Sequence, residues 1–222
     1  MPESFYDTKY YGKLKPSEKV ERRAKIKSPE QKFLETIIKP KAGDKILDVG
    51  CGPGIILGML EETGADLWGI DISENAVEIA KKRVSKPEQI ICANAEPLPF
   101  DSDNFDYVIA WGVIEHFPSI PSILEEIKRV LKKDGQSIIM VPNAYYYKFV
   151  WDTFRKGKGP VKLQEIEALY SFKEWKDLME KAGLVVLRTA RHNKFDKPGL
   201  IRLRNFLIPY YFSHHFVFVC SK

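Results

Sequence analysis

Residues 45–60, KILDVGCGPGIILGML, decide the fold of this chain. A short apolar run ends at Val49, three glycines follow at alternate positions, and an apolar helical pattern begins after them (Gly50, Gly52 and Gly54). Glycines between a strand and a helix allow a ligand to approach the backbone more closely than a side chain would permit. The stretch therefore predicts a strand, a ligand-binding turn and a helix.

From Pro40 onward, strand patterns alternate with helix patterns. We expect strands at 44–50, 66–72, 89–95, 105–111, 136–142, 184–190 and 214–221, and helices at 55–63, 73–84, 120–135 and 171–183. Such alternation predicts an α/β fold, a Rossmann-like doubly wound seven-stranded sheet with helices on both faces. No helix pattern separates the last two strands, so the sheet should be mostly parallel with an antiparallel last strand at or near an edge.

Local signals support several of these boundaries. Ser73 is placed to cap the second helix, and Ser171 with Glu174 has the spacing of a capping box. Gly135 should end the helix that begins at residue 120.

In a sheet of this kind, ligands bind beyond the carboxyl ends of the strands. The glycine loop is G-x-G-x-G, whereas a dinucleotide fingerprint is G-x-G-x-x-G, and its third glycine position is Ile55 here. Pro53 also removes one N–H donor that a pyrophosphate would need. No Gly-Lys-Ser/Thr follows, which excludes a P-loop.

An acidic residue at the second strand favours a ribose ligand. Asp71 lies 21 residues after Gly50, where a carboxylate can accept hydrogen bonds from ribose hydroxyls. The alternative is that Asp71 merely caps the next helix, but Ser73 is the better cap.

Composition describes an ordinary globular chain. It has 222 residues, 44% hydrophobic and 29% charged, with no apolar run of the roughly 18 residues that span a membrane. The beginning of the chain lacks the apolar core of a signal peptide, and three distant cysteines show no metal spacing, so we expect a cytoplasmic location. The net charge of +5 is concentrated in residues 9–32, either as a solvated helical face or as a binding surface for phosphate or an acidic partner.

Four ordered blocks together carry a family resemblance. The blocks ILDVGCGPG, GIDIS, ANAEPLPFDSDNFDYVIAWGVIEHF and EEIKRVLKKDGQSIIMVPN resemble the class I S-adenosylmethionine-dependent methyltransferases over residues 44–142. The nearest branch acts on small molecules and includes enzymes of quinone biosynthesis. The resemblance implies S-adenosyl-L-methionine as cofactor and S-adenosyl-L-homocysteine as product.

The resemblance also implies roles for individual residues. The glycine loop with Cys51 would pass against the methionine part, Asp48 would order the loop and the amino group, and Asp71 would hold the ribose. Asn94 stands where the family usually has aspartate, and its carbonyl oxygen can still accept a bond from the adenine amino group. The full implied cofactor set is Asp48, Gly50, Cys51, Gly52, Gly54, Asp71, Ile72, Asn94, Ala95 and Trp111, with Ile72 and Ala95 at the adenine and Trp111 at the methionine.

Methyl transfer from a sulfonium needs alignment of the acceptor and exclusion of water, and no metal is required. His116 is the candidate general base, or else it pairs with Glu115 only to fix the loop. His192, His214 and His215 should also lie near the carboxyl edge, the edge of the sheet at which the parallel strands have their carboxyl ends. Residues 110–113, AWGV, differ from the Asn/Asp-Pro-Pro-Tyr/Phe motif of base-methylating enzymes, which makes a nucleic-acid substrate unlikely.

The remaining segments concern the acceptor. Residues 1–40 are predicted to form a helical cover carrying Tyr6, Tyr10 and Tyr11, or else a helix packed permanently on the sheet. The methyltransferase domain spans 41–222, with aromatic and basic insertions at 143–170 and 191–215. They predict a pocket for a small-molecule or lipid-like acceptor with an anionic group, lined by Tyr146, Trp151, Arg202 and Tyr210. The alternatives for these insertions are a self-packed helical subdomain or a dimer contact.

The activity expected from these features is O- or C-methylation. A non-catalytic S-adenosylmethionine-binding regulatory subunit is the alternative, and a dehydrogenase is a distant third. The sequence carries no signal for an oligomeric state.

Overall fold

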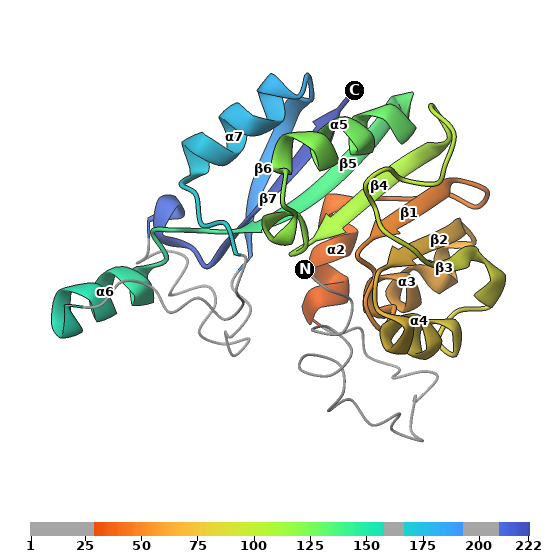
Figure 1. Ribbon diagram of the computed structural model, residues 1–222, viewed down its shortest axis with the longest axis horizontal. Helices are drawn as coiled ribbons and strands as arrows, with labels where there is room; N and C mark the ends of the chain where they lie inside the picture. Colours follow the sequence, from red (N-terminus) through yellow and green to blue (C-terminus); the bar gives the residue numbers. More distant parts are fainter. Residues whose placement is uncertain (1–28, 158–166, 193–208) are drawn as a thin grey trace.

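The computed structural model describes residues 29–157, 167–192 and 209–222. Its centre is a seven-stranded sheet in the order β3-β2-β1-β4-β5-β7-β6 (Figure 1). The strands are β1 (Lys45–Val49), β2 (Asp66–Asp71), β3 (Ile90–Cys92), β4 (Phe105–Trp111), β5 (Leu131–Pro142), β6 (Val185–His192) and β7 (His215–Ser221).

The pairing of the strands confirms the predicted fold class. Strands β1 to β5 pair in parallel with one another, whereas β7 pairs antiparallel with both β5 and β6. The last strand is therefore inserted next to the edge strand β6, which agrees with the prediction of an antiparallel strand at or near an edge.

Helices cover both faces of the sheet, as Figure 1 shows. The helices α2 (Pro29–Ile37), α3 (Ile55–Leu60) and α4 (Glu74–Lys81) share one apolar core, while α5 (Ile120–Val130) and α7 (Phe172–Lys181) pack into the other. We call the side with α2, α3 and α4 the loop face of the sheet, because the glycine loop leads into α3. A further helix, α6 (Tyr147–Lys156), lies beyond the end of β5, and short 3₁₀ turns include η2 (Glu61–Thr63), η3 (Pro87–Gln89), η4 (Ile114–His116) and η5 (Tyr210–Phe212).

The structure confirms the predicted caps. The Ser73 side chain accepts a hydrogen bond from the Ala76 backbone at the start of α4. Ser171 and Glu174 form the capping box of α7, with both reciprocal bonds present. These side chains satisfy backbone donors that would otherwise have no partner at a helix start.

The predicted end of the helix that begins at residue 120 is wrong. The helix ends at Val130, and β5 starts at Leu131, which pairs with Phe105 before the register shifts. Leu131 is fully buried, and the Lys132 ammonium reaches the Asp106 carboxylate at 2.7 Å. Gly135 lies in the irregular stretch of β5, where an added Cβ would come within 3.0 Å of the Asp106 carbonyl oxygen. Its role is close packing against β4, which a helix-stop rule does not anticipate.

Only part of the N-terminal segment lies within the described residues. In α2, Leu34 and Ile37 are buried against the loop face, and the Arg188 guanidinium donates to the Ile37 carbonyl. Residues 1–28, with the three tyrosines assigned to a cover, lie outside the described residues. The helical cover and the domain boundaries stay predictions.

A single tryptophan ties α7 to the end of β5. Trp175 is fully buried, its indole N–H donates to the Pro142 carbonyl at 2.9 Å, and its ring meets Tyr170 edge-on. We expect Trp175→Phe to lower the free energy of unfolding by about 2–4 kcal/mol, because it removes this bond and leaves unfilled volume. The same change at exposed Trp151 should cost less than about 0.5 kcal/mol. Urea titrations compare the two, and equal losses would contradict the assignment.

Candidate cofactor and acceptor site

Five strands direct polar or aromatic side chains to the loop face at one edge of the sheet, β1, β2, β4 and β6 from their carboxyl ends and the antiparallel β7 from its amino end. Ile46, Ile109 and Val217 belong to the core on this face, and side chains two positions apart on a strand share a face. The alternation therefore places Asp48, Trp111 and His215 on the loop face. Asp71 also lies on the loop face, because Gly69, two residues before it, faces that side: an added Cβ at Gly69 would meet side chains of α3 and the glycine loop. His192 lies on the same face, because it comes two residues after Ala190, which packs against the core on that side.

Close contacts within the protein leave no room for a side chain at two of the loop glycines. Gly50 has φ +66°, and an added Cβ would lie 2.3 Å from the Val113 side chain. Gly54 has φ +70°, and its Cβ would lie 3.0 Å from Ala80 of α4. We expected a ligand to be the reason for these glycines, yet close contact with the loop after β4 (residues 112–119, called the β4 loop) and with α4 accounts for two of the three.

The amide groups of the loop are largely occupied. The Cys51 N–H donates to the Ile70 carbonyl at 3.0 Å, and the Gly54 N–H donates to the Cys51 carbonyl at 3.0 Å. The Gly52 N–H donates to the Asp71 carboxylate at 2.8 Å. A loop that binds pyrophosphate must keep such donors for the ligand. This hydrogen bonding argues against a dinucleotide.

Asp71 holds the loop to the start of α4. One of its carboxylate oxygens accepts from Gly52, and the other accepts from the Ser73 N–H at 2.9 Å. These contacts fix the position of the carboxylate at the end of β2. Ribose binding by Asp71 stays a prediction, whereas the capping role belongs to Ser73, as expected.

Asp48 is the second carboxyl group beside the loop. It is buried, and its Oδ2 atom has no hydrogen-bond partner. Burial raises the pKa of Asp48 well above its usual value, and the nearby charge of Asp71 raises it further. The pKa of the Cys51 thiol is raised by burial and then by the charges of these same two carboxylates. A ligand that brings positive charge would favour the ionised form of Asp48, so two carboxyl groups in this position suit a cationic ligand and not a phosphate.

The implied adenine contacts lie after β3. Asn94 is exposed, and its Oδ1 atom accepts a hydrogen bond from the Glu96 N–H at 3.2 Å. Ala95 beside it is buried, and Ile72 is half-buried at the end of β2. The one oxygen of Asn94 is thus shared with the backbone, whereas the usual aspartate would have a second oxygen for an adenine amino group.

Aromatic rings from three distant segments meet at the same edge. The Trp111 ring lies 6.1 Å from Phe33 of α2 and 5.7 Å from His192 at the end of β6. His192 is buried, 6.1 Å from His215, and the His215 ring contacts His214. The predicted position of these histidines near the carboxyl edge is confirmed, and Trp111 stands between them and the glycine loop.

The β4 loop carries a buried acid that sequence reasoning did not assign. His116 is half-buried, with its Nε2 atom 3.9 Å from Glu115 Oε1. Glu115 is buried, its Oε2 atom has no hydrogen-bond partner, and burial, with a contribution from the charge of Glu167, raises its pKa to about 8. The motif VIEHF showed the pair, but it gave no signal that Glu115 would be buried deeper than His116.

Of the residues proposed for the acceptor, three are described. Tyr146 is buried with its ring 4.4 Å from His214, and Tyr210 stacks on Phe216 at 5.8 Å. Trp151 lies apart from both on α6 and is 60% exposed. Arg202 lies outside the described residues. Tyr146 and Tyr210 pack on other aromatics, as the self-packing alternative expects, and the pocket stays a prediction.

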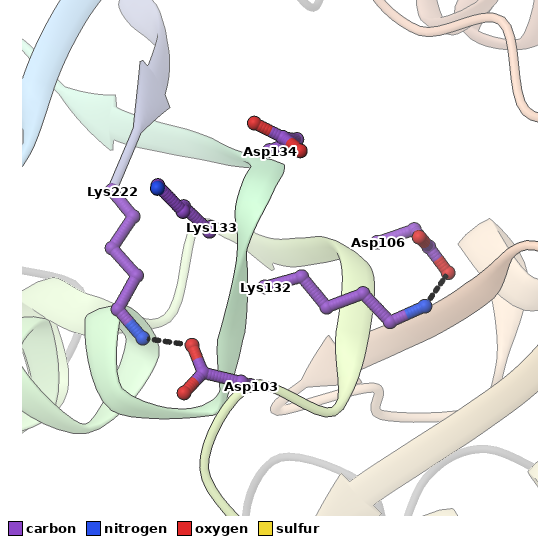
Figure 2. Close-up of a pocket in the computed structure, with 6 residues that line it drawn as sticks. All are labelled: Asp103, Asp106, Lys132, Lys133, Asp134 and Lys222. Atoms are coloured by element: carbon purple, nitrogen blue, oxygen red, sulfur yellow. Dashed lines mark hydrogen bonds and ion pairs between the residues drawn. The ribbon is translucent and has the colours of Figure 1, made fainter.

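A separate hollow of about 660 Å³ lies at the opposite edge of the sheet (Figure 2). Four of its six charged lining residues form ion pairs, Lys132 with Asp106 at 2.7 Å and Lys222 with Asp103. The hollow is formed at the amino ends of β4 and β5, away from the glycine loop, so we do not assign the chemistry to it.

Neither a metal cluster nor a membrane-spanning helix occurs among the described residues. Within 29–157, 167–192 and 209–222, no cluster of three or more His, Cys, Asp or Glu side chains could hold a metal ion. Over the same ranges, the structure contains no helix both long and apolar enough to cross a membrane.

Comparison with known proteins identifies a family. Residues 47–139 match the family described as "Methyltransferase domain". An uncharacterized protein of Methanocaldococcus jannaschii is 33% identical over 210 residues, covering 85% of this chain and 80% of the relative. A demethylmenaquinone methyltransferase of Bacillus cereus is 29% identical over 187 residues, covering 76% and 74%. A solved S-adenosylmethionine-dependent methyltransferase from Thermotoga maritima has a TM-score of 0.65 at 21% identity, covers 87% of both chains and shows the same fold.

The buried Glu115 generates a prediction about stability and pH. The unfolded chain ionises this group near 4.5, whereas the folded chain keeps it protonated up to about 8. Stability should therefore fall as pH rises through that window, by up to about 1.4 kcal/mol per unit from this group. We expect Glu115→Gln to make the fall shallower by the share of this group, with the share of buried Asp48 remaining, while Glu125→Gln at an exposed position should leave it unchanged. Urea unfolding at pH 5 and pH 7.5 measures this, and equal pH dependence in all three proteins would contradict it.

Proposed function

The chain belongs to the class I S-adenosylmethionine-dependent methyltransferases, and we propose that it methylates a small-molecule or lipid-like acceptor at oxygen or carbon. The chain is thus an enzyme that uses S-adenosyl-L-methionine. One observation carries the assignment of the binding site, namely the two carboxyl groups of Asp48 and Asp71 beside a loop whose amides are occupied. Such a site favours a cationic ligand over a pyrophosphate.

Each residue of the site has a proposed role in binding. The cofactor, when bound, supplies a methyl group activated on a positively charged sulfur. Asp48 attracts the positive charge of the methionine part, and Asp71 accepts hydrogen bonds from the ribose while it holds Gly52 in place. Trp111 closes the methionine side, and Ile72 with the backbone of Ala95 contacts the adenine. These groups orient the reacting carbon and exclude water, which is most of what this displacement requires.

His116 is our candidate for the proton acceptor. It lies in the loop that Val113 packs against the glycine loop, so it belongs to the same edge of the sheet. Glu115, with its pKa near 8, is mostly uncharged at neutral pH and adds no full negative charge beside His116. His116 would accept the proton of an acceptor hydroxyl or of a carbon acid as the methyl is transferred.

The nature of the acceptor is supported by the residues around the carboxyl edge. Aromatic rings crowd this edge, including Trp111, Tyr146 and Tyr210, and a mixed apolar and basic surface continues onto α6. The B. cereus relative acts, by its name, on demethylmenaquinone. An apolar acceptor with an ionisable hydroxyl or carboxylate fits these features. A cytoplasmic location also stays a proposal, supported by the free thiols of Cys51, Cys92 and Cys220.

An acceptor screen tests the proposed class. We expect formation of S-adenosyl-L-homocysteine with phenolic or prenylated carboxylates and little with neutral sugars or amines. Turnover limited to small, polar, uncharged acceptors would show that the class is wrong. Binding of S-adenosylmethionine without turnover on any acceptor would favour the non-catalytic regulatory subunit.

The charge of Asp48 generates a prediction about affinity. A cation bound beside Asp48 favours its ionised form, so affinity for S-adenosylmethionine should rise with pH as the free group ionises. Asp48→Asn should weaken binding by about tenfold or more at the pH of tightest binding, since it removes a charge-assisted contact, and should flatten the pH profile. Asp134→Asn, at the exposed opposite edge, is the matched control. Calorimetry at pH 6, 7 and 8 measures both, and parental affinity in Asp48→Asn would refute the role.

A further inference from the structure

Helix α6 presents one apolar face. Four of its apolar side chains recur at the i, i+3, i+4 and i+7 positions, which places them on one side of a helix. These are Tyr147, Val150, Trp151 and Phe154, and we call them the aromatic face of α6. In Figure 1 the helix stands out from the body of the molecule beyond the end of β5.

The aromatic face is open to solvent. Phe154 is 86% exposed, Trp151 60% and Val150 40%, and no residue of α6 is buried. The Trp151 and Phe154 rings lie 6.4 Å apart, so they form one patch. A helix with such a face normally buries it, and a gathered exposed apolar patch marks a site of interaction.

Positive charge borders this face. Lys148 and Arg155 stand three residues before and four residues after Trp151, which places them along its side of the helix. The one acid of the helix, Asp152, pairs with Lys156 at 3.0 Å. Within the described part of the chain, no ion pair involves Lys148 or Arg155. The border of the aromatic face therefore carries two positive charges that pair with no acid among the described residues.

The base of α6 is joined to a second exposed aromatic segment. The Asn143 side-chain amide donates to the carbonyls of Tyr211 and Ser213, both at 2.8 Å, which holds η5 beside the start of the helix. In η5, Tyr211 is 59% exposed and Phe212 37%. A second group of exposed rings therefore lies beside the start of α6.

We propose that the aromatic face of α6 docks on an anionic lipid surface, with the helix lying in the plane of the interface. Aromatic residues on one side and Lys or Arg along the border are the pattern of helices that bind membrane surfaces. A second copy of the chain fits less well. The exposed rings offer a few hundred Å², whereas a stable dimer buries about 800 Å² on each partner.

Docking would bring the carboxyl edge of the sheet next to a membrane. Tyr146, the residue before α6, already contacts His214 at that edge. The link to a lipid-like acceptor rests on the proposed function, but docking itself does not. Vesicle binding is measured without cofactor or acceptor, so the two ideas can fail separately.

The experiment is flotation of the full chain with vesicles of phosphatidylcholine, with or without phosphatidylglycerol. We expect binding to the anionic vesicles, and loss of at least about tenfold in partitioning for Trp151→Ser with Phe154→Ser. Val185→Ser with Leu187→Ser, which removes two exposed apolar residues from β6, should bind as the parent does. Circular dichroism checks that each variant is folded.

Two further measurements separate the contribution of positive charge to vesicle binding from that of the aromatic rings. Lys148→Ser with Arg155→Ser should bind neutral and anionic vesicles equally weakly, because the charge preference is gone. Trp151 is the most exposed of the four tryptophans, so a blue shift of fluorescence on vesicle addition should be lost in Trp151→Phe. Failure of the parent to bind anionic vesicles would overturn the proposal. So would parental binding by the aromatic-face variant, or a dimer in sedimentation that the same variant abolishes.

Discussion

The glycine loop is tied to the sheet by one buried carboxyl group, and a second buried carboxyl group lies on the neighbouring strand. Asp71 accepts hydrogen bonds from Gly52 and Ser73, which ties the end of β2 to both the loop and α4. Asp48, on the neighbouring strand, is buried with one oxygen unpartnered. A buried carboxyl group without a partner is unfavourable, and a ligand that brings positive charge relieves this cost. Asp71 thus fixes the backbone of the loop, and the unpartnered oxygen of Asp48 favours a ligand that carries positive charge.

The amino ends and the carboxyl ends of the strands form two chemically different edges of the sheet. At the amino ends of β4 and β5, acids and lysines pair with one another, so that edge is electrically balanced. At the carboxyl ends, the loop face carries the buried acids of β1 and β2 and, farther along the sheet, the contacting rings of Trp111 and His192. Beyond β5 the surface becomes aromatic and basic along α6. The amino ends of the strands therefore carry paired charges, the carboxyl ends carry the proposed cofactor site, and the exposed aromatic helix α6 starts beside that site.

Much of the fold could be predicted from local patterns. The order of strands and helices, the Ser73 cap and the antiparallel last strand all follow from spacing and from the absence of a helix pattern between the last two strands. Other features depend on contacts between distant residues. The end of α5 at Val130 is set by pairing of Leu131 with Phe105, and the need for Gly50 comes from Val113, more than sixty residues away. The burial of Glu115 in the β4 loop also depends on contacts with distant residues, and no local sequence pattern predicts it.

Calorimetric titration of the unaltered chain with S-adenosylmethionine and with NAD tests the central claim most directly. The account predicts saturable binding of S-adenosylmethionine and no detectable binding of NAD at the same concentrations, because the loop keeps its amides for Ile70, Asp71 and Cys51. Binding of NAD as tight as that of S-adenosylmethionine would contradict it, since a pyrophosphate would then be accommodated beside two carboxyl groups.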